Sequence, residues 1–154
     1  MISKPLTPQL IDATCAELAS KAGPAIDEPT VKVVLEMAQA VLHGASIRSA
    51  NEVAWMRAEA DATEEVARRF VADLPDATVL AAALQTYLDA KTDSLYLADV
   101  QADYARASEV LSCAAEAAYA DGDAERIATV GSLFDQRMTN ENTVTGVFIA
   151  AGRT

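Results

Sequence analysis

Acidic and basic side chains four residues apart form the most regular chemical pattern in the chain. The segment 57–69 contains the pairs Arg57–Asp61, Glu64–Arg68 and Glu65–Arg69. On a helix such residues lie on one face and form surface ion pairs, each worth a few tenths of a kcal/mol. Carboxylates from several helices are also the ligands that Mg²⁺ prefers. Because charges at this spacing are typical of solvated helix faces, we interpret the segment as structural.

The usual ligands of transition metals are scarce. The chain has one histidine, His43, and two cysteines, Cys15 and Cys113, which lie far apart in the sequence. A dinuclear iron bundle needs two Glu-x-x-His pairs, and a zinc site needs three or four clustered Cys or His ligands. We therefore expect no metal and no cofactor, two reduced and buried thiols, and a histidine near a helix end.

Two short motifs resemble parts of known sites but are incomplete. Asp121-Gly-Asp123 begins like a calcium loop, yet Arg126 stands at the sixth position and Ser132 at the twelfth. Tyr87 and Lys91 have the spacing used by some nicotinamide enzymes, but the chain has no glycine-rich phosphate turn. We interpret Asp123 as a helix N-cap and Tyr87 as a core residue. A catalytic set is not expected.

The elements that position these residues are predicted to be helices. Hydrophobic residues make up 51% of the 154-residue chain, and alanine, the best helix former, is the most frequent residue. Apolar residues recur at helical spacing in six segments. The sequence predicts a single all-α domain over residues 1–154, folded as a helical bundle. The predicted helices start near Thr7, Glu28, Ser49, Asp76, Asp93 and Asp123.

The predicted ends of these helices rest on local signals. Gly23-Pro24 ends the first helix, Gly44 the second and Leu74-Pro75 the third. Ser49 and Glu52 fit a capping box at the start of the third. The fourth ends near Lys91, and one long helix with a stutter over residues 76–121 is the alternative to the break there.

Two further features of the helical pattern bear on the fold. A globin-like arrangement is the alternative to the bundle, without haem, because no histidine lies between the third and fifth helices. The apolar residues of the tail, Val144, Val147, Phe148 and Ala151, keep helical spacing, so a short docked helix is expected at the end.

Net charge excludes some classes of partner. The chain carries −11 overall, and residues 70–125 hold only Lys91 and Arg106 against eleven carboxylates. Such a field repels nucleic-acid phosphates and anionic membrane surfaces. The N-terminus has no apolar signal region and no stretch approaches 18 apolar residues. A cytoplasmic protein that binds neither nucleic acid nor membrane is expected.

The leading functional hypothesis is a non-catalytic interaction protein, such as an adaptor, chaperone or regulatory subunit. Trp55 stands at the margin of an apolar arc, where an interface anchor is expected. Asp99 and Asp103 are expected on an outward acidic face that attracts a basic partner segment. A homodimer is also expected, through the third predicted helix or the tail around Phe148 and Ile149.

The alternative hypothesis is an enzyme or small-ligand-binding protein with a site inside the bundle. Helical bundles build such sites from facing side chains. Tyr87, Tyr96 and Tyr104 would supply it, together with nearby carboxylates. A polar, enclosed cavity would favour this alternative, and a filled core would favour the interaction protein.

Overall fold

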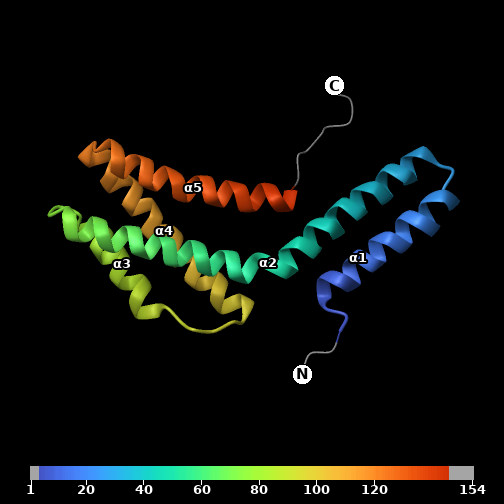
Figure 1. The fold of residues 1–154 in the computed structure, drawn as a ribbon, viewed down its shortest axis with the longest axis horizontal. Helices are drawn as coiled ribbons and strands as arrows, with labels where there is room; N and C mark the ends of the chain where they lie inside the picture. The colour runs from blue at the N-terminus through green and yellow to red at the C-terminus, as the bar shows by residue number, and fades with distance from the viewer. Residues whose placement is uncertain (1–3, 146–154) are drawn as a thin grey trace. The chain divides into compact units, whose positions relative to one another are not determined.

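The chain folds into helices. A computed structural model describes residues 4–145, and within that range it contains no strand. The described α-helices are α1 (Thr7–Glu17), α2 (Pro29–Asp73), α3 (Thr78–Ala90), α4 (Leu97–Asp121) and α5 (Ala124–Thr145) (Figure 1). A π-helical turn (Leu18–Ala22) and a 3-10 turn (Gly23–Ala25) follow α1. The all-α prediction is confirmed, and the globin-like alternative is not needed.

The expected break between the second and third helices is absent, because α2 is continuous from Pro29 to Asp73. Gly44 lies inside this helix, where a Cβ atom would come within 3.4 Å of the Val144 carbonyl oxygen. Gly44 therefore allows α5 to approach α2 closely and does not end a helix. Ser49 does not act as a cap, since its hydroxyl donates to the carbonyl of Ser46 at 2.9 Å. The described chain therefore has five α-helices rather than six.

Two other predicted boundaries, the break between α3 and α4 and the start of α5, are confirmed. Helices α3 and α4 are separate elements, so the single stuttered helix is wrong. The Asp123 carboxylate accepts the backbone N–H of Arg126 at 2.9 Å and caps α5, as its sequence position indicated. The expected helix in the tail lies outside the described residues, apart from Val144 at the end of α5.

The chain divides into two compact units, which we call the terminal unit (Met1–Glu52 and Glu141–Thr154) and the core unit (Val53–Asn140). Helices α2 and α5 each contribute residues to both. The prediction of one domain stays a prediction.

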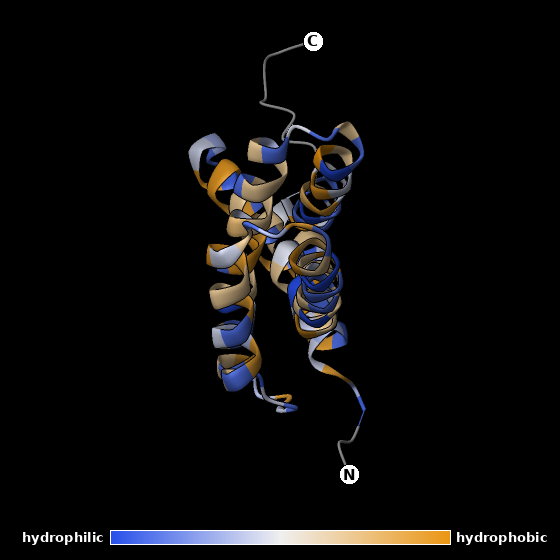
Figure 2. Ribbon diagram, turned by 90° about the vertical axis from the view of Figure 1, so that its left-hand side faces the viewer, coloured by the Kyte–Doolittle hydropathy of each residue, from blue (hydrophilic) through white to orange (hydrophobic). Residues whose placement is uncertain are grey.

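The core unit contains all the buried apolar residues of residues 4–145. Phe70 of α2, Leu80 and Tyr87 of α3, and Leu111 of α4 are all at most 1% exposed. Small side chains allow close packing between them, since Ala67, Ala107 and Ala114 are fully buried. Hydrophobic and hydrophilic residues alternate around the helices (Figure 2), as amphipathic packing requires.

The terminal unit has almost no interior. Its fully buried described residues are Gly44 and Ser46, and the Ser46 hydroxyl donates to the Pro8 carbonyl at 3.3 Å. Leu35 and Leu42 of α2 are only half-buried.

Within residues 4–145, none of the helices combines the length and apolar character needed to cross a membrane.

Two glycines allow the helix geometry to be tested. Gly122 ends α4 with φ of 77°, whereas Gly131 lies inside α5, where a Cβ atom would have no neighbouring atom within 4 Å. We expect Gly131→Ala to raise the free energy of unfolding by about 0.5–1 kcal/mol and Gly122→Ala to lower it by about 1–2 kcal/mol. Urea unfolding followed by circular dichroism measures both. Equal effects of the two substitutions would contradict the assignment of Gly122 as a left-handed cap.

Candidate functional site

A buried carboxylate lies at the centre of the core unit. Asp103 of α4 is 1% exposed, and its Oδ2 atom accepts hydrogen bonds from Arg57 Nη1 at 2.8 Å and from the Thr92 backbone N–H at 3.1 Å. The Thr92 hydroxyl donates to the same oxygen at 3.2 Å. Arg57 also donates to the carbonyl oxygen of Ser94. One charge pair therefore joins α2, the 91–96 connection and α4.

These contacts determine the ionisation of Asp103. Burial by itself would raise the pKa of Asp103, but the hydrogen bonds from Thr92 and Arg57 outweigh it and lower the pKa below its ordinary value. Asp103 is therefore a charged, fully satisfied structural group, rather than a general base whose pKa lies near neutrality.

The expectation that Asp103 lies on an outward acidic face is wrong, because the residue is buried. A signal was present in the sequence: Asp103 falls three residues after Val100 and four before Ala107, both of which are buried. Its partner Arg57 lies 46 residues earlier in the sequence, and no spacing pattern predicts a contact at that separation. Asp99 is exposed and accepts the Ser94 hydroxyl at 2.6 Å, next to the start of α4.

The other carboxylates of residues 89–116 are exposed. Binding of a basic partner therefore stays a prediction, but one that no longer involves Asp103. The exposed carboxylates are Asp89, Asp93, Asp99, Glu109 and Glu116.

A second polar cluster lies around Glu59 of α2, whose side chain is 9% exposed. Its Oε2 atom accepts the Tyr104 hydroxyl at 2.6 Å and lies 3.4 Å from Arg137 Nε, while Oε1 accepts from Asn140 Nδ2 at 2.6 Å. The Arg137 guanidinium stacks 4.8 Å from the centre of the Tyr104 ring. Both oxygens of Glu59 are thus engaged.

A cavity of about 270 Å³ adjoins this cluster. Trp55 lines it and is half-buried, which agrees with its position at the margin of the apolar arc. The other lining residues are Ala58, Glu59, Ala62, Thr63, Leu133, Gln136, Arg137 and Asn140. The Arg137 Nη2 atom is buried and has no hydrogen-bond acceptor among the described residues.

The three tyrosines of the ligand-binding hypothesis do not converge on this cavity. Tyr104 donates to Glu59, whereas Tyr96 is 81% exposed and Tyr87 is buried among α3 and α4. Tyr87 instead lies beside Lys91, whose Nζ atom is 5.6 Å from the ring centre.

Lys91 connects the end of α3 to α2. Its ammonium group donates to Asp61 at 2.8 Å and to Glu64 at 2.9 Å. The hydrogen bond to Asp61 raises the pKa of Lys91, since it outweighs the opposing effect of burial, and the bond to Glu64 adds to the increase. The expected i,i+4 pair of Glu64 and Arg68 forms at 2.8 Å. These carboxylates therefore act in ion pairs.

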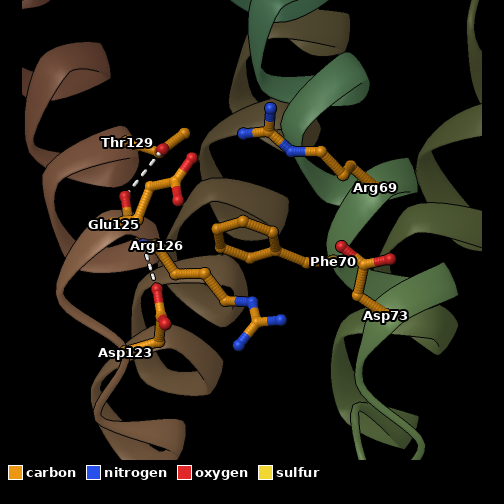
Figure 3. A pocket seen from close by; sticks show the side chains of 7 residues that line it. All are labelled: Arg69, Phe70, Asp73, Asp123, Glu125, Arg126 and Thr129. Carbon is orange, nitrogen blue, oxygen red and sulfur yellow. Dashed lines mark hydrogen bonds between the residues drawn. The ribbon is translucent and has the colours of Figure 1, made fainter.

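A smaller cavity of about 160 Å³ lies where α2 and α5 face each other near Phe70 (Figure 3). The Phe70 ring lies between the side chains of Arg69 and Arg126 in this view, and carboxylates surround them. Arg126 is paired with Asp121. The lining is slightly acidic, because two guanidinium groups face three carboxylates, those of Asp73, Asp123 and Glu125. Neither an anion nor a metal ion is favoured by such a lining.

The terminal unit presents a continuous apolar face on the first part of α2. Val33, Val34, Met37 and Val41 are between 53% and 73% exposed. Together with the exposed Ala38, Ala40 and Ala45 they form what we call the α2 apolar face. At about 1.5 Å per residue, this face extends roughly 20 Å along the helix. A groove of about 680 Å³ runs along it, closed on one side by Val144 and Thr145 of α5.

Other candidate residues stay apart. His43 is exposed in the middle of α2 rather than at a helix end, and Cys15 and Cys113 are free and half-buried. Burial raises the pKa of the Cys113 thiol, as do Glu109 and Glu116, so less of this thiol is ionised at neutral pH than of an ordinary cysteine. Over residues 4–145, no three His, Cys, Asp or Glu side chains are grouped closely enough to hold a metal ion.

Comparison with known proteins yields no match: no family model fits the chain, and no curated protein or solved structure is significantly similar to it.

The buried pair gives a prediction for stability. Arg57→Met leaves the buried Asp103 charge with only the more exposed Arg106, whose Nη1 atom lies 3.4 Å from Asp103 Oδ1, as a cationic partner. We expect the free energy of unfolding to fall by about 3 kcal/mol. Surface Arg68→Met is the control and should cost under about 1 kcal/mol. Urea unfolding at neutral pH measures both, and a small loss for Arg57→Met would contradict the buried pair.

The same pair predicts a pH dependence. Because the folded state lowers the pKa of Asp103, its stabilisation is complete above the ordinary carboxyl pKa and is lost as the pH falls through the lower, folded-state pKa. Asp103→Asn should therefore show a smaller loss of stability on acidification than the wild type. The free energy of unfolding of both proteins is measured from neutral pH to about pH 2.5. An equal loss in the wild type and in Asp103→Asn would contradict this assignment.

Proposed function

We propose that the protein is a non-catalytic interaction module that assembles through the α2 apolar face, and that the occupant of this face is a second copy of the chain. The observation that carries the proposal is the exposure of Val33, Val34, Met37 and Val41 on a unit whose described part buries only Gly44 and Ser46. Contiguous exposed apolar patches on a folded chain usually mark interaction sites.

The face of α2 that contacts α1 differs from the one left open. Ser46 bonds to Pro8, and Leu35 lies near Gly23. At about 100° per residue, these positions point away from Val34, Met37 and Val41. The α2 apolar face is therefore not the face that α1 covers, and among the described residues it stays largely exposed.

Charge favours a second copy meeting through the terminal unit. The described residues of that unit carry four basic and seven acidic side chains, net −3, whereas the core unit carries seven and sixteen, net −9. Repulsion between two identical surfaces grows with the charge on each. None of the seven residues of the α2 apolar face is ionisable, and the two charged side chains that line the same groove, Glu36 and Arg48, are of opposite sign. The face can therefore pair with its own copy across a two-fold axis without gathering like charges.

Replacing one residue at the centre of the face should prevent assembly. We expect Val41→Asp to weaken the dimer at least about a hundredfold, because an unpaired carboxylate would be buried and each tenfold change corresponds to about 1.4 kcal/mol. Val79→Asp is the matched control, since Val79 is 67% exposed on α3 in the core unit. Sedimentation velocity at tens of micromolar measures the oligomeric state of all three proteins.

Dimeric wild type and Val79→Asp beside monomeric Val41→Asp would support the proposal. A monomeric wild type, or equal behaviour of the two variants, would overturn it. A protein of another sequence bound at the same face would leave the purified chain monomeric and would therefore also count against the second copy as occupant.

A further inference from the structure

We propose that the cavity beside Trp55 binds a small, uncharged, mostly apolar molecule that carries one hydrogen-bond acceptor, such as a carboxamide. This site lies wholly in the core unit and is independent of the α2 apolar face. It revises the ligand-binding hypothesis, since the residues around the cavity are not the three tyrosines that the sequence indicates.

A residue that lines the cavity carries an unused hydrogen-bond donor. Arg137 Nη2 is buried without an acceptor among the described residues. Glu59, the adjacent carboxylate, is already occupied by Tyr104, Asn140 and Arg137 Nε. A buried donor left without an acceptor is rare in folded proteins and is unfavourable, so an acceptor brought by a ligand would remove the penalty.

Two side-chain amides also line the cavity and carry hydrogen-bond donors. Gln136 Nε2 donates to Asn140 Oδ1 at 3.2 Å, and Asn140 Nδ2 donates to Glu59. Each amide nitrogen keeps a second hydrogen. Gln136 and Asn140, which line the cavity together with Arg137, therefore carry further donors, and a ligand carbonyl is the complementary group.

The charges around the cavity disfavour a charged ligand. Glu59 and Arg137 compensate each other at 3.4 Å, with side chains 9% and 21% exposed. A ligand carboxylate would add an unbalanced negative charge beside Glu59 in a chain of net charge −11. A ligand cation would find both oxygens of Glu59 already bonded. An uncharged ligand avoids both penalties.

The apolar residues of the cavity determine the size and character of the rest of the ligand. Trp55, Ala58, Ala62 and Leu133 line it, and the volume is about 270 Å³. An aromatic ring would pack against the indole and the small side chains. A molecule of about ten non-hydrogen atoms would bind with a dissociation constant on the order of a few millimolar, given typical affinities per atom.

Trp55 supplies the readout, because it is the only tryptophan in the chain. Phenylacetamide is the probe, and phenylacetate is its charged counterpart of the same shape. We expect phenylacetamide to shift the Trp55 emission with a saturating curve, and phenylacetate to bind about tenfold more weakly or worse.

Two variants keep the test decisive. Ala62→Leu fills the cavity and should weaken phenylacetamide binding by about tenfold or more, whereas Ala72→Leu, exposed on the same helix, should leave it unchanged. Arg137→Met should also weaken binding, and its circular dichroism spectrum shows whether the fold is kept. A linear response in the wild type, an unchanged affinity in Ala62→Leu, or equal binding of phenylacetate would overturn the proposal.

Discussion

The uneven distribution of buried apolar side chains is the constraint on which the rest of the structure depends. Phe70, Leu80, Tyr87 and Leu111 are buried in the core unit, whereas the described part of the terminal unit buries only a glycine and a serine. Since apolar burial is the main favourable term in folding, the core unit has its own source of stability. The exposed valines and Met37 of the terminal unit contribute to stability only when another surface covers them.

Polar interactions in the core unit serve specificity more than net stability. The Arg57–Asp103 pair and the Glu59 cluster connect α2 to α4 and α5 at single, well-defined positions. Buried ion pairs gain little over apolar packing, yet breaking one is costly. Such pairs fix which helix faces meet, and in the Glu59 cluster one buried guanidinium nitrogen of Arg137 has no acceptor among the described residues.

The sequence predicts the helical class and several boundaries, because those depend on local signals. Asp123 caps α5, and the break between α3 and α4 follows a phase change in the apolar pattern. The predictions for Gly44 and Asp103 are wrong because each residue contacts a partner that is distant in the chain. Gly44 lies against Val144, and Asp103 binds Arg57. Trp55 stands out from its position in the pattern, but Glu59, Arg137 and Asn140 do not, because their cluster spans 81 residues and has no spacing signature.

We infer that a second copy of the chain buries the α2 apolar face. Hydrogen exchange followed by mass spectrometry at several protein concentrations tests it most directly, because protection gained by association follows mass action. The account predicts that amides of residues 31–45 become more protected as concentration rises, while those of residues 107–114 in the buried part of α4 do not change. Protection of residues 31–45 that is independent of concentration would contradict it.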